Sequence, residues 1–473
     1  MEKQLSCVLM LPLKQIALRR FAATLWNEPD ILASIGKFRE RIQYGDYQKK
    51  WCGTVEFEVL DKISKLQLPE SLTKQIIQIL KPMGLRILRW KIFHEAFLSQ
   101  SNCDYPFEYF NVSILEKLCW TTAGTVDYRK TAEELILCNV VDIVKRYKLA
   151  CLYCLDHYIP EFWKELPQEN KMYFYNRKHI RLPLLQFCWP YILKGEEYKL
   201  CVNSITGNPF GDSTLFQQRI FTCLSFAGNK AAVKYFFQKL SLEEREASLI
   251  NAANSALGSQ NVEPGHYPWR FPKENVTDVV FYLLSLMNPE QQSRFFRERP
   301  SDVLECFLDW PWQDAFLNIA DAMWRSGTSC KKLRHSVGQD AEKDSKFRLL
   351  FTKELFNIQD TETINVILSN VDAGDRVRLV LSEFFFGHFY YFMWRGSVHV
   401  VEMCLRETGL SKEDKKRLKE DFMVFLRSLD SGQIEWGAPK WRRFFEFLDE
   451  TDASSQSKRS LNDEALPEAK KLF

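Results

Sequence analysis

From residue 230 the chain reads Lys230-Ala-Ala-Val-Lys-Tyr-Phe-Phe-Gln-Lys-Leu-Ser-Leu-Glu-Glu244, and from residue 277 it reads Thr277-Asp-Val-Val-Phe-Tyr-Leu-Leu-Ser-Leu-Met-Asn-Pro-Glu-Gln291. The two stretches align without a gap at an offset of 47 residues, the difference between 230 and 277. Their apolar positions recur at steps of three and four, which is the spacing of one face of an α-helix. The equivalent residues are Val233, Phe236, Phe237 and Leu240 in the first copy and Val280, Leu283, Leu284 and Met287 in the second.

A polar residue closes each of these predicted helices and opens the next. Ser241 and Asn288 are both good N-cap residues, and each is followed by a helix-starting residue and then by acidic or amide side chains. The repeated unit is therefore predicted to be a helix, a tight turn and a second helix.

Further copies of this pattern occur on both sides. Downstream, Ile364, Ile367, Leu368 and Val371 carry the same face, and 396–405 aligns on 228–237 with a capping turn at 410–414. Upstream, 148–155 aligns on 230–237 with a turn at 166–169, and 68–71 precedes an apolar helix predicted over 72–97. Repeated helical hairpins of about 40 to 47 residues are typical of an α-solenoid, in which each unit buries its apolar face against its neighbours.

Composition supports an all-α chain. Of the 473 residues, 46% are hydrophobic and 14% aromatic, which excludes a mostly disordered protein. The 19 Gly and 18 Pro residues provide few turns for a large sheet protein. The formal net charge of +3 gives no global electrostatic footprint for nucleic acid.

Two stretches resemble a known repeat family. Phe226-Ala-Gly-Asn-Lys-Ala-Ala-Val-Lys-Tyr-Phe-Phe237 and Arg395-Gly-Ser-Val-His-Val-Val-Glu-Met-Cys-Leu405 are similar to the inter-helix turn and second helix of an ankyrin repeat. The Thr-Pro-Leu-His signature of ankyrin repeats is absent, and the period exceeds 33 residues. The chain thus resembles divergent, degenerate ankyrin-like repeat proteins. This resemblance implies a helical-hairpin array that binds other proteins.

Breaks in the pattern suggest boundaries. We expect an N-terminal helical region over 1–125, and a helical-repeat solenoid whose first part covers 126–325 and whose second part covers 347–450. The polar segment 326–346 is predicted to be a loop or linker, and 451–473, rich in Ser, Lys, Asp and Glu, is predicted to be a disordered tail. A loop between hairpins is also expected over 258–273, which contains three prolines.

No motif indicates catalysis, a cofactor or a metal. Cys151, Cys154 and His157 stand at three-residue steps that would share one side of a helix, but the repeat alignment places both thiols in the positions of Val233 and Phe236, which favours packing. His94-Glu95 begins a metalloprotease-like helix signature that fails at Leu98. We therefore expect a chain that is not an enzyme and has no cofactor.

Candidate binding residues come from two aromatic segments. Trp310 and Trp312 flank a proline, and Tyr390, Tyr391 and Trp394 precede Gly396, so a corner between hairpins could expose these large side chains to a protein partner. The basic clusters 331–334 and 415–419 could contact phosphates, although acidic residues flank the second and favour a solvated helix face.

The sequence favours a non-catalytic protein-protein interaction scaffold. The alternatives are a helical-repeat RNA-binding protein and an effector-like enzyme whose site is assembled from distant residues. Thirteen scattered cysteines indicate a reducing compartment, and no apolar run has the ~20 residues needed to cross a bilayer. We expect a cytoplasmic protein, with the nucleus not excluded, that uses neither a membrane nor nucleic acid as its partner.

Overall fold

The computed structural model describes residues 11–39, 47–99, 110–138, 140–176, 183–200, 213–259, 270–307, 310–312, 319, 373–381, 383–395, 398–428 and 439–449. These residues are predominantly helical and contain no β-strand, as the sequence predicts, with one isolated antiparallel bridge between Trp120 and Val126. The chain divides into two compact units, Met1–Ser326 and Gly327–Phe473. The predicted linker, the predicted tail and the repeat copy at 364–371 lie outside the described residues, as does most of the loop predicted over 258–273.

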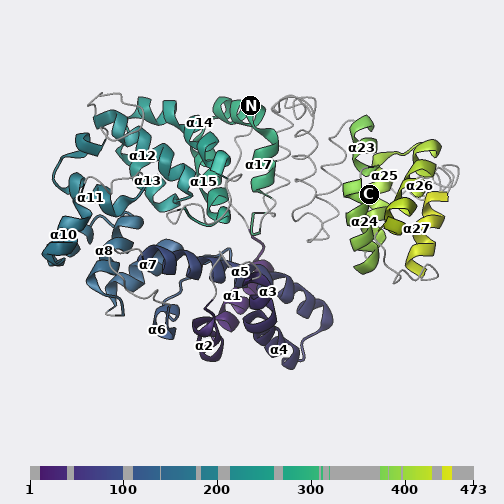
Figure 1. Ribbon diagram of the computed structural model, residues 1–473, viewed down its shortest axis with the longest axis horizontal. Helices are drawn as coiled ribbons and strands as arrows, with labels where there is room; N and C mark the ends of the chain where they lie inside the picture. Colours follow the sequence, from purple (N-terminus) through teal and green to yellow (C-terminus); the bar gives the residue numbers. More distant parts are fainter. Residues whose placement is uncertain are drawn as a thin grey trace, which may run out of the picture. The chain divides into compact units, whose positions relative to one another are not determined.

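The first unit begins with helices arranged around a long one (Figure 1). They are α1 (Leu13–Trp26), α2 (Pro29–Lys37), α3 (Tyr47–Trp51), the π-helix η2 (Cys52–Glu56), α4 (Phe57–Lys65), α5 (Glu70–Ser99) and α6 (Val112–Leu115). The helix predicted over 72–97 is thus confirmed as α5, which packs against α1 and α4.

The first unit continues through a series of shorter helices. They are α7 (Tyr128–Leu137), α8 (Ile143–Leu152), α9 (Ile159–Glu165), α10 (Gln168–Phe174), α11 (Leu185–Leu193), the 3-10 helix η4 (Glu197–Leu200), α12 (Ser213–Ala227), α13 (Lys230–Lys239), α14 (Leu242–Ser259), α15 (Lys273–Leu286), α16 (Pro289–Glu298) and α17 (Pro300–Cys306). The described part of the second unit consists of α23 (Ala373–Val380), α24 (Glu383–Arg395), α25 (Val398–Thr408), α26 (Lys412–Ser428) and α27 (Pro439–Asp449). None of the described helices is both long and apolar enough to cross a membrane.

The repeat found in the sequence is visible in the helix ends. α13 and α15 both stop one residue before an extended apolar residue, Leu240 (φ −74°, ψ 144°) and Met287 (φ −72°, ψ 141°), 47 positions apart. Val233, Phe236, Val280 and Leu283, the four residues predicted at equivalent core positions, are all buried. The two copies therefore share their helix ends as well as their apolar face.

A reciprocal capping box starts the helix after each turn. The hydroxyl of Ser241 accepts from the backbone N–H of Glu244 (3.3 Å), and the Glu244 carboxylate accepts from the N–H of Ser241 (2.7 Å). Asn288 and Gln291 form the same pair of bonds, and Ser411 and Asp414 repeat it before α26. Two otherwise unsatisfied N–H groups are satisfied at each helix start.

The packed helix pair does not span the Leu-Ser turn of the 47-residue repeat. The most extensive contacts join α12 with α13, α12 with α14, and α14 with α15, whereas α13 and α14, on either side of Ser241, contact each other much less. The antiparallel partners α12 and α13 are joined by Gly228, which has a φ of +78°, and Asn229. The tight Leu-Ser turn therefore does not close a packed hairpin. The turn that does lies at Gly228-Asn229, within the stretch whose resemblance to an ankyrin repeat implies an inter-helix turn.

One predicted helix is also shorter than expected. The apolar pattern predicts that Cys151, Cys154 and His157 share a helix, but α8 ends at Leu152 and Cys154 has a φ of +50°. Both thiols are buried, whereas the His157 side chain is 95% exposed. These three side chains therefore do not lie on one helical face.

Candidate protein-binding groove

Trp310 and Trp312, predicted as partner-binding residues, lie beside α5 and α15 in the first unit. Trp310 is half-buried, its carbonyl accepts a hydrogen bond from Arg86 (2.5 Å), and its ring lies 5.2 Å from the Arg19 guanidinium. Trp312 is 7% exposed, donates to the Asp278 carboxylate (3.0 Å) and packs against other aromatic rings. Trp310 thus retains accessible surface, whereas Trp312 is almost fully buried and offers a partner very little.

The remaining predicted binding residues lie on α24 in the second unit. Tyr390 is half-buried and stacks on Trp441 of α27, with ring centroids 6.3 Å apart. Tyr391 and Trp394 are helical, but their side chains lie outside the described part of the chain. The five predicted residues are therefore divided between the two units, three on α24 and two beside α15.

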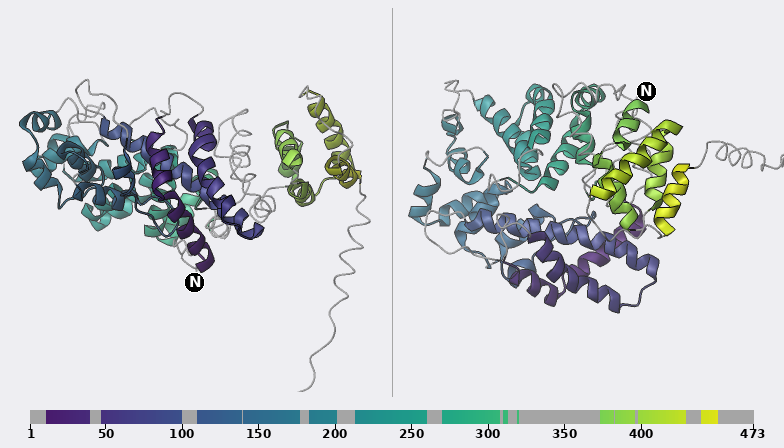
Figure 2. Two further views of the ribbon diagram at one scale, coloured as in Figure 1. Left: turned by 90° about the horizontal axis from the view of Figure 1, so that it is seen from below. Right: turned by 45° about the vertical axis from the view of Figure 1, so that its right-hand side comes forward.

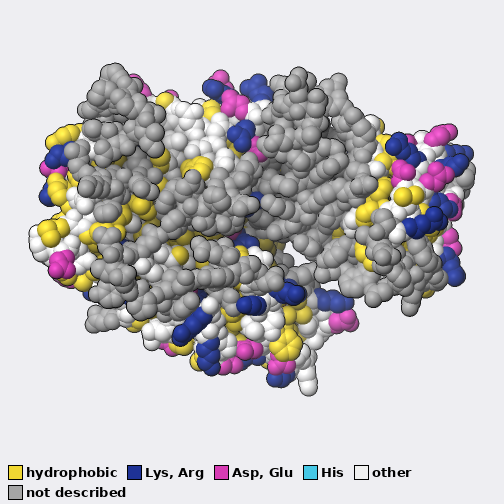
Figure 3. All heavy atoms as spheres, viewed as in Figure 1, with side chains coloured by type: hydrophobic (Ala, Val, Ile, Leu, Met, Phe, Trp, Pro, Cys, Tyr) yellow, Lys and Arg dark blue, Asp and Glu magenta, His cyan; other side chains and the backbone are white. Residues whose placement is uncertain are grey.

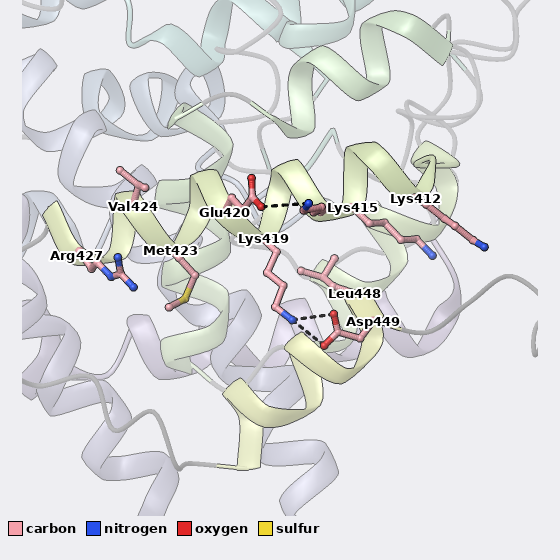
Figure 4. Close-up of a pocket in the computed structure, with 10 residues that line it drawn as sticks. Lys412, Lys415, Lys419, Glu420, Met423, Val424, Arg427, Leu448 and Asp449 are labelled. Atoms are coloured by element: carbon pink, nitrogen blue, oxygen red, sulfur yellow. Dashed lines mark hydrogen bonds and ion pairs between the residues drawn. The ribbon is translucent and has the colours of Figure 1, made fainter.

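A groove that the sequence does not predict runs between α26 and α27 (Figure 4). Its volume is about 740 Å³. It is lined by Lys412, Lys415, Lys416, Lys419, Glu420, Met423, Val424, Arg427, Leu448 and Asp449.

The groove exists because α26 buries its other face. Leu418, Phe422 and Leu426 repeat at helical spacing and are buried, and Phe422 packs on Phe386 of α24 with ring centroids 5.5 Å apart. The contacts of α26 with α24 and α27 account for this face, and the four helices α24 to α27 lie side by side (Figure 2). Val424, at 64% exposure, is left on the uncovered face.

Charges of both signs surround the exposed apolar residues. Lys419 reaches from α26 to Asp449 at the end of α27, with bonds of 2.7 and 2.8 Å to the two carboxylate oxygens (Figure 4). Lys416 pairs with Glu420 at 4.0 Å, and the mixture of signs over these helices is visible in Figure 3. Five cations thus line the groove against two carboxylates.

Two of these cations lack an acidic partner. Within the part of the chain that the structure describes, no carboxylate lies within ion-pair distance of Lys412 or Arg427, although both side chains line the groove. The groove lining therefore combines three apolar residues, Met423, Val424 and Leu448, with an excess of positive charge. This combination suits a ligand with one apolar and one acidic face.

The residues weighed as metal ligands are packed differently. Burial raises the pKa of the Cys151 and Cys154 thiols well above the usual range, so both are protonated at neutral pH. Among the described residues, no group of three or more His, Cys, Asp or Glu side chains is arranged to hold a metal ion.

His94 and Glu95 on α5 are also enclosed. Nδ1–H of His94 donates to the Trp90 carbonyl (2.8 Å), so Nε2 accepts from the Tyr153 hydroxyl (2.5 Å). Glu95 accepts from the ammonium of Lys91 (2.7 Å) and from the backbone N–H of Phe110 (2.6 Å). Burial lowers the pKa of His94 to about 3, and these side chains act as polar links between helices.

Neither a scan of protein-family models nor a search of curated proteins finds a match to this chain.

Proposed function

We propose that the protein is a non-catalytic protein-protein interaction scaffold, built as an ankyrin-like helical-repeat solenoid. Support for the solenoid comes from the packing order, in which α12 contacts α14 and α13 contacts α15, so that each helix packs on the next but one. The Gly228-Asn229 turn between the antiparallel helices α12 and α13 supports the ankyrin-like part of the proposal. Stacked hairpins of this kind present extended surfaces that bind proteins without a deep pocket.

The observation that carries the binding proposal is the uncovered face of α26. In the first unit, α14 covers one side of α12, and in the second unit α24 and α26 are related in the same way. Among the described residues, no helix takes the corresponding place on the far side of α26, where the groove lies. A helix from a partner would fill that place as the next helix of the array.

The chemistry of the groove selects the kind of helix. Met423, Val424 and Leu448 require an apolar stripe, and the cations of the lining favour Asp or Glu beside it. The proposed occupant is therefore an acidic, amphipathic helix of a protein partner. Apolar residues provide most of the binding free energy in such grooves, while the charges favour the orientation and rate of docking.

Affinity capture with the full chain tests this proposal. The bait carries Val424→Asp, which replaces an apolar lining residue by a carboxylate at a position that is 64% exposed and so leaves the fold intact. Lys130→Gln, on the exposed surface of α7, is the matched control bait. We expect the captured amount of at least one protein to fall about tenfold or more with Val424→Asp, which corresponds to a loss of about 1.4 kcal/mol in binding free energy. The captured amount of the same protein should be unchanged with Lys130→Gln.

Two outcomes would contradict the proposal. The first is a set of captured proteins that is the same for the wild-type, Val424→Asp and Lys130→Gln baits. The second is captured RNA, released steeply by added salt, which would favour a nucleic-acid-binding function.

Trp310 of the first unit and Tyr390 of the second are two further, separate proposed contacts, because both rings are half-buried and such aromatic anchors dominate many interfaces. Alanine at either position would weaken capture if these rings touch a partner. Capture that is unaffected by one of these substitutions, in a protein with unchanged helix content, would remove that residue from the proposal.

A further inference from the structure

A second hollow, in the first unit, is lined by three separate segments, and two of them contribute cations. Its volume is about 370 Å³. It is lined by Arg129 of α7, Cys154, Asp156 and His157 of the turn between α8 and α9, and Lys234, Tyr235, Gln238 and Lys239 of α13.

Local capping and turn geometry bring these segments together. Asp127 caps α7 by accepting from the N–H of Lys130 (3.0 Å), which places Arg129 in the first helical turn. The side chain of Asn229, which caps α13, also donates to the Leu152 carbonyl at the end of α8 (2.7 Å). The polar face of α13 is thereby held beside the turn that follows α8.

The cations in this hollow are poorly neutralised. Lys234 lies 5.2 Å from the centre of the Tyr282 ring and Lys239 lies 5.1 Å from that of Tyr235, but no carboxylate of the described residues is within ion-pair distance of either ammonium. Arg129 pairs with Glu133 (2.9 Å), which is not among the lining residues.

The positive charges also act on one another. Burial lowers the pKa of Lys234, and the charges of Lys230 and Arg129 lower it further, while the more weakly acting charges of Asp127 and Asp278 oppose this shift. One carboxylate, Asp156, lines the hollow against three permanent cations. An anion would relieve this repulsion, because each cation would gain a partner of opposite sign.

We propose that this hollow is a binding site for a phosphate monoester. Arg129 provides a planar fork of N–H donors, and Lys234 and Lys239 provide point charges, the two cationic modes by which proteins hold phosphoryl oxygens. The Tyr235 hydroxyl and the Gln238 amide are neutral donors in the same lining. The small volume suits a phosphoryl group with a short attached chain, such as a phosphorylated side chain, more than a long polyanion.

The site is independent of the proposed groove, which is formed by α26 and α27 of the other unit. Failure of one proposal therefore leaves the other standing.

Isothermal titration of the full-length protein tests the phosphate site. The probes are O-phosphoserine and inorganic phosphate, with sodium sulfate and serine as controls, at constant ionic strength. We expect saturable binding of O-phosphoserine, weaker binding of inorganic phosphate, and no binding of serine. Binding of inorganic phosphate at least as tight as that of O-phosphoserine would assign the site to the free ion, whereas tighter binding of O-phosphoserine assigns it to a phosphorylated side chain.

Substitutions at exposed positions locate the binding. Lys234→Gln and Arg129→Gln should each weaken O-phosphoserine binding about tenfold or more, whereas Lys130→Gln, at an exposed neighbour of Arg129 that does not line the hollow, should leave it within a factor of two. The proposal is overturned if O-phosphoserine gives no saturable signal, if sulfate binds equally well, or if both substitutions leave the affinity unchanged in protein with unaltered helix content.

Discussion

The side-chain amide of Asn229 joins the start of α13 to the end of α8 at Leu152, 77 residues earlier in the chain. Its nitrogen donates to the carbonyl of Leu152 (2.7 Å), and its oxygen accepts from the backbone N–H of Ala232 (3.1 Å). Asn229 is 2% exposed, so both bonds are shielded from water. One side chain therefore provides hydrogen-bond partners for a carbonyl at the end of α8 and for an N–H group at the start of α13.

This double role predicts a large effect of substitution. Asn229→Ala removes both bonds and leaves the buried Leu152 carbonyl unsatisfied, so we expect a loss of about 2 to 4 kcal/mol in the free energy of unfolding. Asn229→Asp keeps the oxygen that caps α13 and loses the donor to Leu152, so part of this loss should remain. Urea unfolding of the two variants measures both contributions, and equal stability of Asn229→Ala and wild type would contradict the assigned role.

The three capping boxes predict smaller, similar effects. Alanine at Ser241, Asn288 or Ser411 removes the side-chain acceptor at the start of α14, α16 or α26, and each change should cost about 1 kcal/mol. Ser411→Asp preserves an acceptor and should cost much less. The shift in the midpoint of denaturant unfolding measures these losses, provided that the slope of the unfolding free energy against denaturant concentration is unchanged. A loss below about 0.3 kcal/mol at all three sites would contradict the assigned capping role.

The enclosed His94 predicts a pH dependence of stability. Its pKa is about 3 in the folded protein, because burial disfavours the imidazolium, and about 6.5 in an unfolded chain. As the pH falls, the unfolded state therefore binds this proton before the folded state does. The contribution of neutral His94 to the free energy of unfolding is complete above pH 6.5 and is lost as the pH falls toward 3, by up to about 1.4 kcal/mol per pH unit.

Unfolding free energies at several pH values between 4.5 and 7.5 measure this slope. His94→Gln should remove the corresponding part of it, whereas His157→Gln, at a side chain that is 95% exposed, should leave it intact. Identical slopes in wild type and His94→Gln would show that His94 titrates normally.

Thiol reactivity should follow burial. Cys52 is exposed, while burial raises the pKa of Cys188 and of Cys404 to about 12 and that of Cys151 and Cys154 well above the usual range. Iodoacetamide at pH 8 should thus modify Cys52 in the native protein and should reach the buried thiols only after unfolding. The reaction at Cys52 should be slower than that of a free thiol, because partial burial and the charge of Glu56 raise the pKa of Cys52.

A related substitution separates packing from metal binding. Replacing Cys151 by Val and Cys154 by Ala should change the free energy of unfolding by at most about 3 kcal/mol, with no loss of bound metal. Stoichiometric zinc in the wild-type protein that disappears in this double variant would contradict the packing role.

Periodicity in the sequence is sufficient to predict the helices and their buried face. Val233 and Val280 occupy equivalent buried positions because both follow the same three- and four-residue spacing before an extended apolar residue. The same local signal cannot show that α12, rather than α14, is the antiparallel partner of α13, because that choice depends on long-range packing. It also misses the turn at Cys154, whose positive φ no glycine marks.

Neither proposed binding site could be predicted from the sequence, for a similar reason. The 415–419 cluster reads as a solvated helix face, yet Lys419 pairs with Asp449, 30 residues away on another helix. The anion site combines Arg129 with residues near 155 and 235, and no local pattern relates these positions. The exposed Val424 within a highly charged helix is the one sequence feature that could indicate the groove.

Amide hydrogen exchange of the full chain, with and without the captured partner, is the most direct test of the proposal that the groove between α26 and α27 binds a protein. We predict that binding slows exchange in peptides from α26 and α27, around Met423, Val424 and Leu448, and that Val424→Asp abolishes this protection. A bound partner that leaves exchange in α26 and α27 unchanged would contradict the claim that this groove is the binding surface of a helical-repeat scaffold.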